Sequence, residues 1–254
     1  MTNVILCGCG GRMGQAIVRA SENDGELRIL AGIDVNADAV GAACKFPVYQ
    51  SIFQVPVHAD VIIDFSHHTA LPSLLEYSVS TATPIVVATT GHTDEEKALM
   101  TEASEKVAVF SSGNMSIGIN LLIELCKTAA ATLGEKFDVE IIEKHHNQKL
   151  DAPSGTAIMI ADGIKEKRES TEYVYDRHSV RKARESSEIG IHSIRGGTIV
   201  GEHEVIFAGN NELISISHTA TSREIFANGA LRAAKYLAKK GAGLYNMSDL
   251  INER

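Results

Sequence analysis

The stretch Val4-Ile5-Leu6-Cys7-Gly8-Cys9-Gly10-Gly11-Arg12-Met13-Gly14 decides the fold of the first half of this 254-residue chain. An apolar run is followed at once by glycines and then by apolar residues 16–18, which is the order of a strand, a tight turn and a helix. Gly8, Gly11 and Gly14 give the spacing GxxGxxG, whereas a strict GxGxxG would need glycine in place of Met13. Glycine permits the tight turn and lets a pyrophosphate approach the backbone at a helix N-terminus. The stretch therefore predicts a dinucleotide-binding loop, with a purely structural turn as the alternative.

Short apolar strands alternate with helices along residues 1–112. We expect strands at residues 27–33, 61–65, 84–88 and 107–110, and helices at residues 71–79 and after Thr93. This alternation predicts an α/β fold with a doubly wound parallel sheet, which binds ligands at the carboxyl ends of its strands. Asp34 ends the second strand, about 20 residues beyond the glycine loop, where a carboxylate accepts hydrogen bonds from an adenosine ribose.

The pattern changes after residue 112. Residues 117–133 form one long apolar helix, and residues 137–143 alternate like a strand with one buried face. β-type alternation returns at residues 189–207 and 213–218, and an amphipathic helix follows at residues 223–240. The second half therefore predicts an α+β domain with a mixed or antiparallel sheet.

The segment Glu143-Lys144-His145-His146-Asn147-Gln148-Lys149-Leu150-Asp151-Ala152-Pro153-Ser154-Gly155-Thr156-Ala157 carries the chemistry. Imidazoles titrate near neutral pH, and lysine supplies a positive charge with three hydrogen-bond donors. The Ser-Gly-Thr turn precedes an apolar run, as at a helix N-terminus that binds anions. The segment predicts an enzyme acting on a carboxylate or phosphate; an exposed polar loop is the alternative. We expect no metal site, because adjacent histidines point in different directions and no Cys or acidic set has ligand spacing.

Composition excludes several classes of function. The net charge is −8 and there is no Trp, which argues against a nucleic-acid partner. We expect no membrane association, because no apolar run approaches the roughly 20 residues of a span. Residues 1–4 do not resemble the start of a signal peptide, and Cys7, Cys9, Cys44 and Cys126 fit reduced thiols better than a disulfide or zinc site. These features predict a cytoplasmic protein.

Four further polar residues allow two interpretations each. His67 and His68 follow a strand, either in a solvated loop or near a bound nicotinamide. Asp151 either caps the following helix, which we favour, or orients Lys149. Arg195 either binds a carboxylate or belongs to a turn.

Further motifs occur in a fixed order over nearly the whole chain. They are the glycine loop, Asp64-Phe65-Ser66, Ala88-Thr89-Thr90-Gly91, Asn114-Met115-Ser116, the segment 143–157, Arg195-Gly196-Gly197 with Val200-Gly201-Glu202-His203, and Phe226-Ala227-Asn228-Gly229-Ala230. Together they resemble the 4-hydroxy-tetrahydrodipicolinate reductase (dihydrodipicolinate reductase) family. The block His-His-x-x-Lys-x-Asp-Ala-Pro-Ser-Gly-Thr is the most specific of them.

The resemblance implies a reaction and a domain plan. The reaction is hydride transfer from NADH or NADPH to a small cyclic dicarboxylate, 4-hydroxy-tetrahydrodipicolinate, in the diaminopimelate route of lysine biosynthesis. The domain plan is a Rossmann dinucleotide-binding domain of residues 1–112 and 223–254, and a domain of residues 113–222 for substrate binding and oligomerisation. A homotetramer is implied as well.

The resemblance also implies roles for residues that match its motifs. His145 would be the catalytic proton donor or acceptor and Lys149 the second proton donor, and His146, Gly155 and Thr156 would bind the substrate carboxylate. Cofactor binding would fall to Gly8, Cys9, Gly10, Gly11, Arg12, Met13, Asp34, Ala88, Thr89, Thr90, Ser112, Gly113, Asn114 and Met115.

Two positions depart from the family's pattern. Ala88 stands where glycine is frequent, and Val35 stands where some members have arginine. Because a 2′-phosphate usually needs a cationic partner, the sequence favours NADH over NADPH, unless Arg12 or Lys45 folds back to supply the charge. Two other functions stay open: a dinucleotide sensor or scaffold that kept the fold, and another Rossmann oxidoreductase such as a semialdehyde or homoserine dehydrogenase.

Overall fold

The computed structural model describes residues 1–253, which form two compact units. The first unit consists of Met1–Ile117 together with the chain from Arg223 onward, and the second of Gly118–Ser222. The first boundary thus lies at the start of the long apolar helix, a few residues beyond the predicted position 112.

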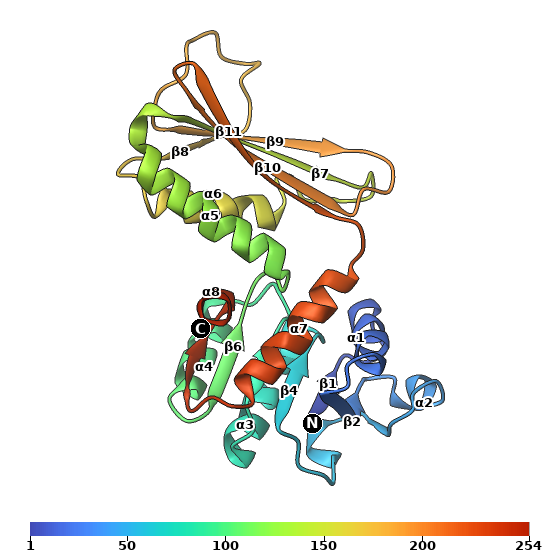
Figure 1. Ribbon diagram of the computed structural model, residues 1–254. Coiled ribbons are helices and arrows are strands. Elements are labelled where there is room, and N and C mark those ends of the chain that lie inside the picture. The colour runs from blue at the N-terminus through green and yellow to red at the C-terminus, as the bar shows by residue number, and fades with distance from the viewer. Residues whose placement is uncertain (254) are drawn as a thin grey trace. The chain divides into compact units, whose positions relative to one another are not determined.

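The first unit is built on a parallel sheet of seven strands in the order β12-β6-β5-β4-β1-β2-β3 (Figure 1). The strands are β1 Thr2–Cys7, β2 Leu27–Ile33, β3 Val48–Tyr49, β4 Val61–Asp64, β5 Ile85–Val87, β6 Ala108–Ser111 and β12 Gly243–Tyr245. The helices are α1 Arg12–Glu22, α2 Ala37–Gly41, α3 Leu71–Thr81, α4 Asp94–Ser104, α7 Glu224–Leu237 and α8 Met247–Asn252, with short 3-10 turns η1 Ile52–Gln54 and η2 His68–Ala70.

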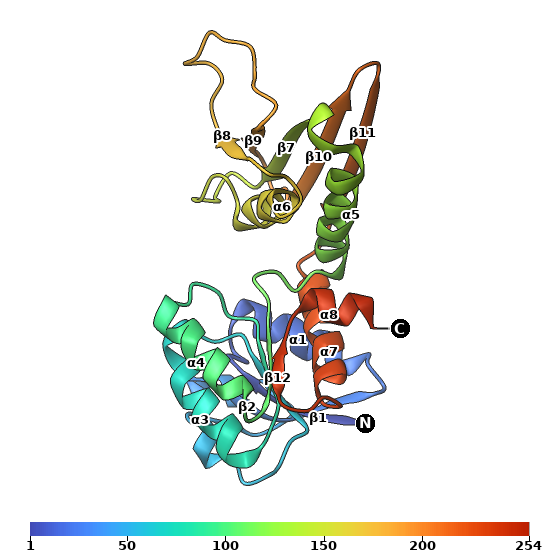
Figure 2. The ribbon, with the colours of Figure 1, turned by 90° about the vertical axis from the view of Figure 1, so that its left-hand side faces the viewer.

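Alternation along β1 gives the sheet a core on each face. Val4 and Leu6 pack with α1, α7 and α8, whereas Ile5 and Cys7 pack with α3 and α4 (Figure 2). Side chains of a strand point to opposite faces in turn, so a strand buried on both faces is apolar throughout. The predicted doubly wound Rossmann-type sheet is confirmed.

The second unit holds a mixed sheet of five strands in the order β11-β10-β7-β9-β8. The strands are β7 Asp138–His145, β8 Glu172–Val174, β9 Glu188–Arg195, β10 Gly201–Gly209 and β11 Glu212–Ala220. Helices α5 Ile117–Leu133 and α6 Gly155–Lys165 cover one face (Figure 2), and η3 Gly134–Lys136 follows α5. β7, β8 and β9 run parallel, β10 pairs antiparallel with β7, and β11 pairs antiparallel with β10, which confirms the predicted α+β domain with a mixed sheet.

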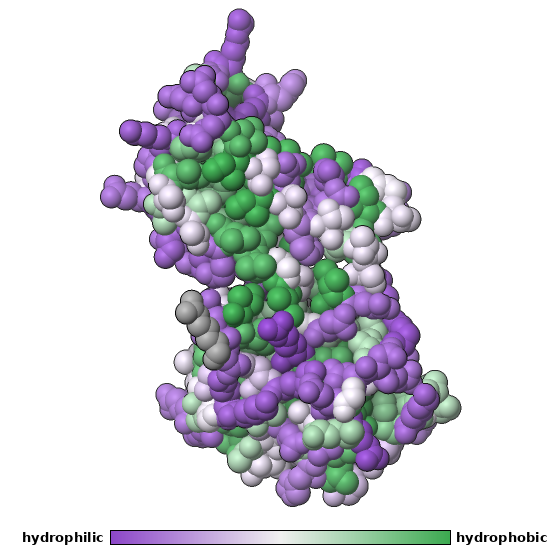
Figure 3. All heavy atoms as spheres, in the orientation of Figure 1, coloured by the Kyte–Doolittle hydropathy of each residue, from purple (hydrophilic) through white to green (hydrophobic). Residues whose placement is uncertain are grey.

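The apolar helix of the second unit corrects one expectation. Among residues 1–253, one helical stretch, Ile117–Lys136, has the length and composition needed to cross a membrane, so the expectation that no such run exists was wrong. Its Ile119, Ile123 and Cys126 are buried in the core of the unit, as in a core helix. Leu121 and Leu125 are 46% and 47% exposed, and Figure 3 shows apolar side chains gathered over α5.

Candidate functional site

The glycine loop joins β1 to α1 in a tight turn. Gly8 has φ +75°, and its N–H donates to the carbonyl oxygen of Ile33 at 2.8 Å. A Cβ on Gly8 would overlap the backbone of Phe65, and one on Gly14 would overlap the Gly8 carbonyl. Side chains are therefore excluded where the loop and the start of α1 pack together. Because the first N–H groups of a helix have no intrahelical partner, this geometry fits a bound pyrophosphate.

Asp34 lies against this loop. Its Oδ2 accepts a hydrogen bond from the Gly10 N–H at 2.9 Å, and its Oδ1 accepts one from the Asn36 N–H at 3.0 Å. The next residue, Val35, is 82% exposed. Lys45 pairs with Glu22 at 2.7 Å. A fixed carboxylate beside a glycine loop suits an adenosine ribose.

The other predicted cofactor residues lie at the carboxyl ends of neighbouring strands. The segment 88–90 follows β5, and the Thr89 hydroxyl donates to Asp64 Oδ2, at the end of β4, at 2.9 Å. The segment 112–115 follows β6, where the Ser112 hydroxyl donates to the Asn114 carbonyl at 2.8 Å. Since β1, β2, β4, β5 and β6 are parallel members of one sheet, all the predicted cofactor residues share one edge.

Asp64, His67 and His68, which lie at this edge, are held by polar contacts. Burial raises the pKa of Asp64, although hydrogen bonds from Ser66 and Thr89 oppose the rise. His68 Nδ1 lies 2.9 Å from Glu96 Oε1, so His68 is tied to α4, while its place near a bound nicotinamide stays a prediction. The His67 ring accepts from the Thr69 N–H at 3.4 Å, at the start of η2.

In the second unit, β7 brings a carboxylate to the predicted catalytic histidine. Alternate residues of β7 are buried, and the last two of these are Glu143 and His145. Glu143 Oε2 lies 2.6 Å from His145 Nδ1. Burial lowers the pKa of His145, as do the nearby charges of Lys149 and Arg195, while Glu143 raises it.

Arg195, at the end of the neighbouring strand β9, binds Glu143 through both terminal nitrogens of its guanidinium group. Its guanidinium donates to the two carboxylate oxygens at 2.8 Å and 2.7 Å, and also to the Asp151 carbonyl at 2.7 Å. Burial alone would raise the pKa of Glu143, but hydrogen bonds from Arg195, Ser193 and His145 hold it at about 2. The Glu143 carboxylate is therefore ionised at neutral pH, and Arg195, the last residue of β9 before the turn, pairs with it inside the protein.

Lys149 lies in the loop between β7 and α6. Its Nζ pairs with Asp151 Oδ1 at 2.9 Å, which lowers the pKa of Asp151. The cap of α6 is Ser154, whose hydroxyl accepts from the Ala157 N–H at 3.2 Å, so the helix-cap interpretation of Asp151 was wrong. Gly155 opens the helix with no atom within 4 Å of where a Cβ would lie. His145, His146, Lys149, Gly155 and Thr156 thus lie on one short stretch from the end of β7 to the first turn of α6.

Sequence reasoning gave no role to three residues of this network. They are Glu143, Ser154 and His203, whose Nε2 lies 3.2 Å from the Ser154 hydroxyl. Burial, followed by the charge of His145, lowers the pKa of His203 to about 4. The alternation of β7 already placed Glu143 on the buried face, and a buried carboxylate needs a cationic partner. Among residues 1–253, no group of three or more His, Cys, Asp or Glu side chains has the arrangement of a metal site.

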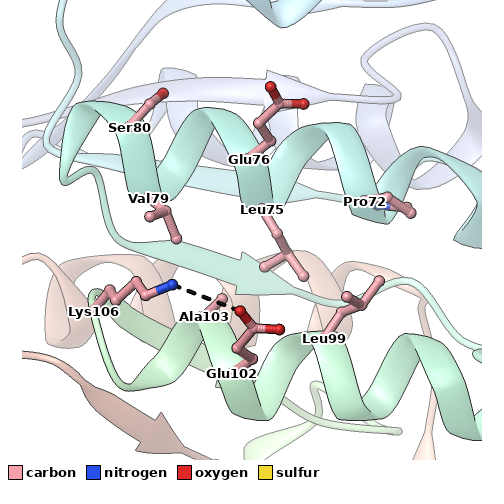
Figure 4. A pocket seen from close by; sticks show the side chains of 9 residues that line it. All are labelled: Pro72, Leu75, Glu76, Val79, Ser80, Leu99, Glu102, Ala103 and Lys106. Carbon is pink, nitrogen blue, oxygen red and sulfur yellow. Dashed lines mark ion pairs between the residues drawn. The ribbon is translucent and has the colours of Figure 1, made fainter.

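A groove of about 400 Å³ lies elsewhere in the first unit, between α3 and α4 (Figure 4). Leu75, Val79 and Leu99 line it, and Lys106 pairs with Glu102 across one turn at 3.6 Å. It contains none of the predicted site residues.

Comparison with known proteins covers both units. Residues 2–115 match the family model described as dihydrodipicolinate reductase, N-terminus, and residues 118–251 match its C-terminus. The 4-hydroxy-tetrahydrodipicolinate reductases of Caldanaerobacter subterraneus and Clostridium novyi are 50% and 51% identical to this chain. Each alignment covers all of this chain and 99% and 100% of the relative.

Solved structures agree with these matches. A dipicolinate-bound dihydrodipicolinate reductase from Paenisporosarcina has a TM-score of 0.80 and 27% identity over 97% of both chains. A probable dehydrogenase from Thermotoga maritima, at 11% identity and a TM-score of 0.67, shares the fold. With both family models matched in order and relatives identical at half of all positions, this chain belongs to the dihydrodipicolinate reductase family.

Proposed function

We propose that this chain reduces 4-hydroxy-tetrahydrodipicolinate to tetrahydrodipicolinate with a hydride from NADH or NADPH, in the diaminopimelate pathway of lysine biosynthesis. The observation that carries the proposal is the short stretch holding His145, Lys149 and the open start of α6. Membership of the reductase family supports it. The reduced thiols of Cys7, Cys9, Cys44 and Cys126 fit work in the cytoplasm.

The residues of the second unit suit a cyclic dicarboxylate. A substrate carboxylate would accept hydrogen bonds from the N–H groups of Gly155 and Thr156, where the helix dipole also favours an anion. His146 would contact the same carboxylate. The ammonium of Lys149 adds positive charge to this patch.

Reduction of the ring also requires a proton. A bound nicotinamide at the first unit would supply the hydride, while the protein orients it. Negative charge then develops on the conjugated ring of the substrate, and a proton donor within hydrogen-bond reach neutralises it. We assign this donation to His145 and Lys149, and cofactor binding to the glycine loop, Asp34 and the segments 88–90 and 112–115.

The assay is NADH oxidation, followed by absorbance, with substrate made in place by dihydrodipicolinate synthase. We expect oxidation that depends on the synthase product. Protein that binds NADH and leaves it unoxidised would instead be a sensor or scaffold. Oxidation with a semialdehyde or homoserine substrate, but not with the synthase product, would indicate a different oxidoreductase.

For the cofactor, we expect kcat/KM to be higher with NADH than with NADPH. Val35 is exposed beside Asp34 and offers no charge to a 2′-phosphate. In Val35→Arg, a guanidinium can form paired hydrogen bonds with that phosphate. The ratio of kcat/KM for NADPH to that for NADH should rise about tenfold, equivalent to about 1.4 kcal/mol. Steady-state kinetics with both cofactors checks this. An unchanged ratio would show that the residue at position 35 does not contribute to the choice between NADH and NADPH.

We further propose that the second unit carries the contacts of a homotetramer. Its helices cover one sheet face, and the opposite face presents Ile142, Ile194, Ile206 and Leu213, of which Leu213 is 61% exposed. Charged side chains such as Glu140, Lys144 and Glu202 lie between these apolar ones on the same face. Large exposed apolar side chains gathered on one face in this way mark an interaction surface. Light scattering should give four times the mass of one chain; a monomer mass at micromolar concentration would contradict the assignment.

A further inference from the structure

We propose that Glu143 and Arg195 are positioning residues that hold His145 as the tautomer with its proton on Nδ1, and that Gly201 keeps His145 Nε2 open for proton transfer. The proposal rests on the proposed function, in which His145 donates a proton. It adds roles for three residues, none of which has to touch the substrate.

The side chains of Glu143 and His145 are placed side by side by the regular backbone of the sheet. Glu143 and His145 are separated by one residue on β7, so both point to the face covered by α5 and α6. The neighbouring strand β9 pairs His145 with Arg195 in register. All three side chains therefore start from adjacent points of one rigid sheet.

Both oxygens of the Glu143 carboxylate take part in hydrogen bonds. Oε1 accepts from Arg195 at 2.7 Å and from the Ser154 N–H at 3.1 Å. Oε2 accepts from Arg195 at 2.8 Å and lies 2.6 Å from His145 Nδ1. An ionised carboxylate only accepts hydrogen bonds, so the proton of this last contact belongs to Nδ1. The neutral ring then presents the lone pair of Nε2, and the protonated ring presents an N–H there.

The other ring nitrogen faces a position without a side chain. A Cβ on buried Gly201 would lie 3.1 Å from His145 Nε2, closer than ordinary van der Waals contact. The ring of His203 meets that of His145 edge-on, with centroids 5.3 Å apart. A side chain at position 201 would therefore press against Nε2, whereas glycine leaves that space free.

The charged groups around His145 decide how its pKa responds. Lys149 and Arg195 lower the pKa and Glu143 raises it. Asp151 is paired with Lys149, and His203 is neutral at working pH. His218, opposite His203 on β11, also has a lowered pKa because of burial. Removing the charge of Glu143 should therefore lower the pKa of His145.

The sign of the effect on activity follows. A histidine that donates a proton must be protonated, so kcat falls as the pH rises through its pKa. In Glu143→Gln this fall should begin at lower pH. At neutral pH we expect kcat to drop about 10- to 100-fold, with the KM for the cofactor unchanged. Gly201→Ala, which leaves Glu143 intact, should lower kcat about tenfold without moving the pH profile.

The experiment combines the pH profiles of kcat with NMR of protein labelled in its histidine rings. The His145 signal is assigned by its loss in His145→Gln, and Glu172→Gln, an exposed residue of β8, is the matched control. The expected result is an Nδ1-protonated ring in the wild type and a shifted profile in Glu143→Gln only. An Nε2-protonated ring in the wild type, or a uniform loss of kcat with an unshifted profile, would overturn the proposal. A wild type without substrate-dependent NADH oxidation would refute the proposed function, while the tautomer is still read by NMR.

Discussion

Replacing Lys149 with alanine should lower kcat by roughly 10²–10⁴, the range for loss of a positioned proton donor. The side chain lies in the second unit, close in the chain to His145 and the open start of α6. The residues assigned to the cofactor lie in the first unit. The Kd for NADH should therefore stay within about a factor of two, which is less than 0.5 kcal/mol.

Steady-state kinetics and a fluorescence titration with NADH measure the two quantities separately. The matched control is Lys167→Ala, since Lys167 is an exposed lysine of the same unit just beyond α6. Its kcat should equal that of the wild type. A large loss of NADH affinity in Lys149→Ala would contradict the separation of roles between the units.

Replacing Arg195 with alanine should lower the free energy of unfolding by about 3–5 kcal/mol, the cost of leaving one member of a buried ion pair alone. Glu143 is fully buried and would lose two hydrogen bonds and its counter-charge. Arg195→Lys should recover part of the loss, because an ammonium restores the charge without the paired geometry.

The pH dependence of stability gives this prediction a sign. The pKa of Glu143 is about 2 in the folded protein, compared with 4.5 for a free glutamate. The ionised carboxylate therefore makes its full contribution to the free energy of unfolding above pH 4.5, and this contribution is lost as the pH falls toward 2. The difference in free energy of unfolding between the wild type and Arg195→Ala, measured from urea unfolding curves, should therefore become smaller as the pH falls from 4.5 toward 2. Arg181→Ala, at an exposed position of the same unit, is the control, and an equal difference at every pH would rule out the ion pair as its source.

Local patterns were sufficient to predict most of the fold. The glycine loop lies between an apolar strand and a helix, and the period of two in β7 shows in the sequence itself. The strand β12 was not predicted, because its three residues begin with glycine and gain their stability by pairing with β6. The predicted strand region 189–207 is two strands, since residues 196–200 turn the chain back.

The residues of the site could be predicted where they lie close together in the sequence. His145, Lys149 and Gly155 fall within one segment, so their proximity follows from spacing. The bond between Arg195 and Glu143 joins residues 52 apart and depends on which strands become neighbours, which no local pattern specifies. The choice between Asp151 and Ser154 as the helix cap also needed the structure, because both residue types are good caps.

The most direct test of the account is a crystal structure of the protein with NADH and a pyridine dicarboxylate. We predict one carboxylate on the N–H groups of Gly155 and Thr156, with His145 Nε2 and Lys149 Nζ turned toward the ring within about 3.5 Å. A ligand bound elsewhere, with those imidazole and ammonium groups directed into solvent, would contradict the assignment of this stretch as the substrate site.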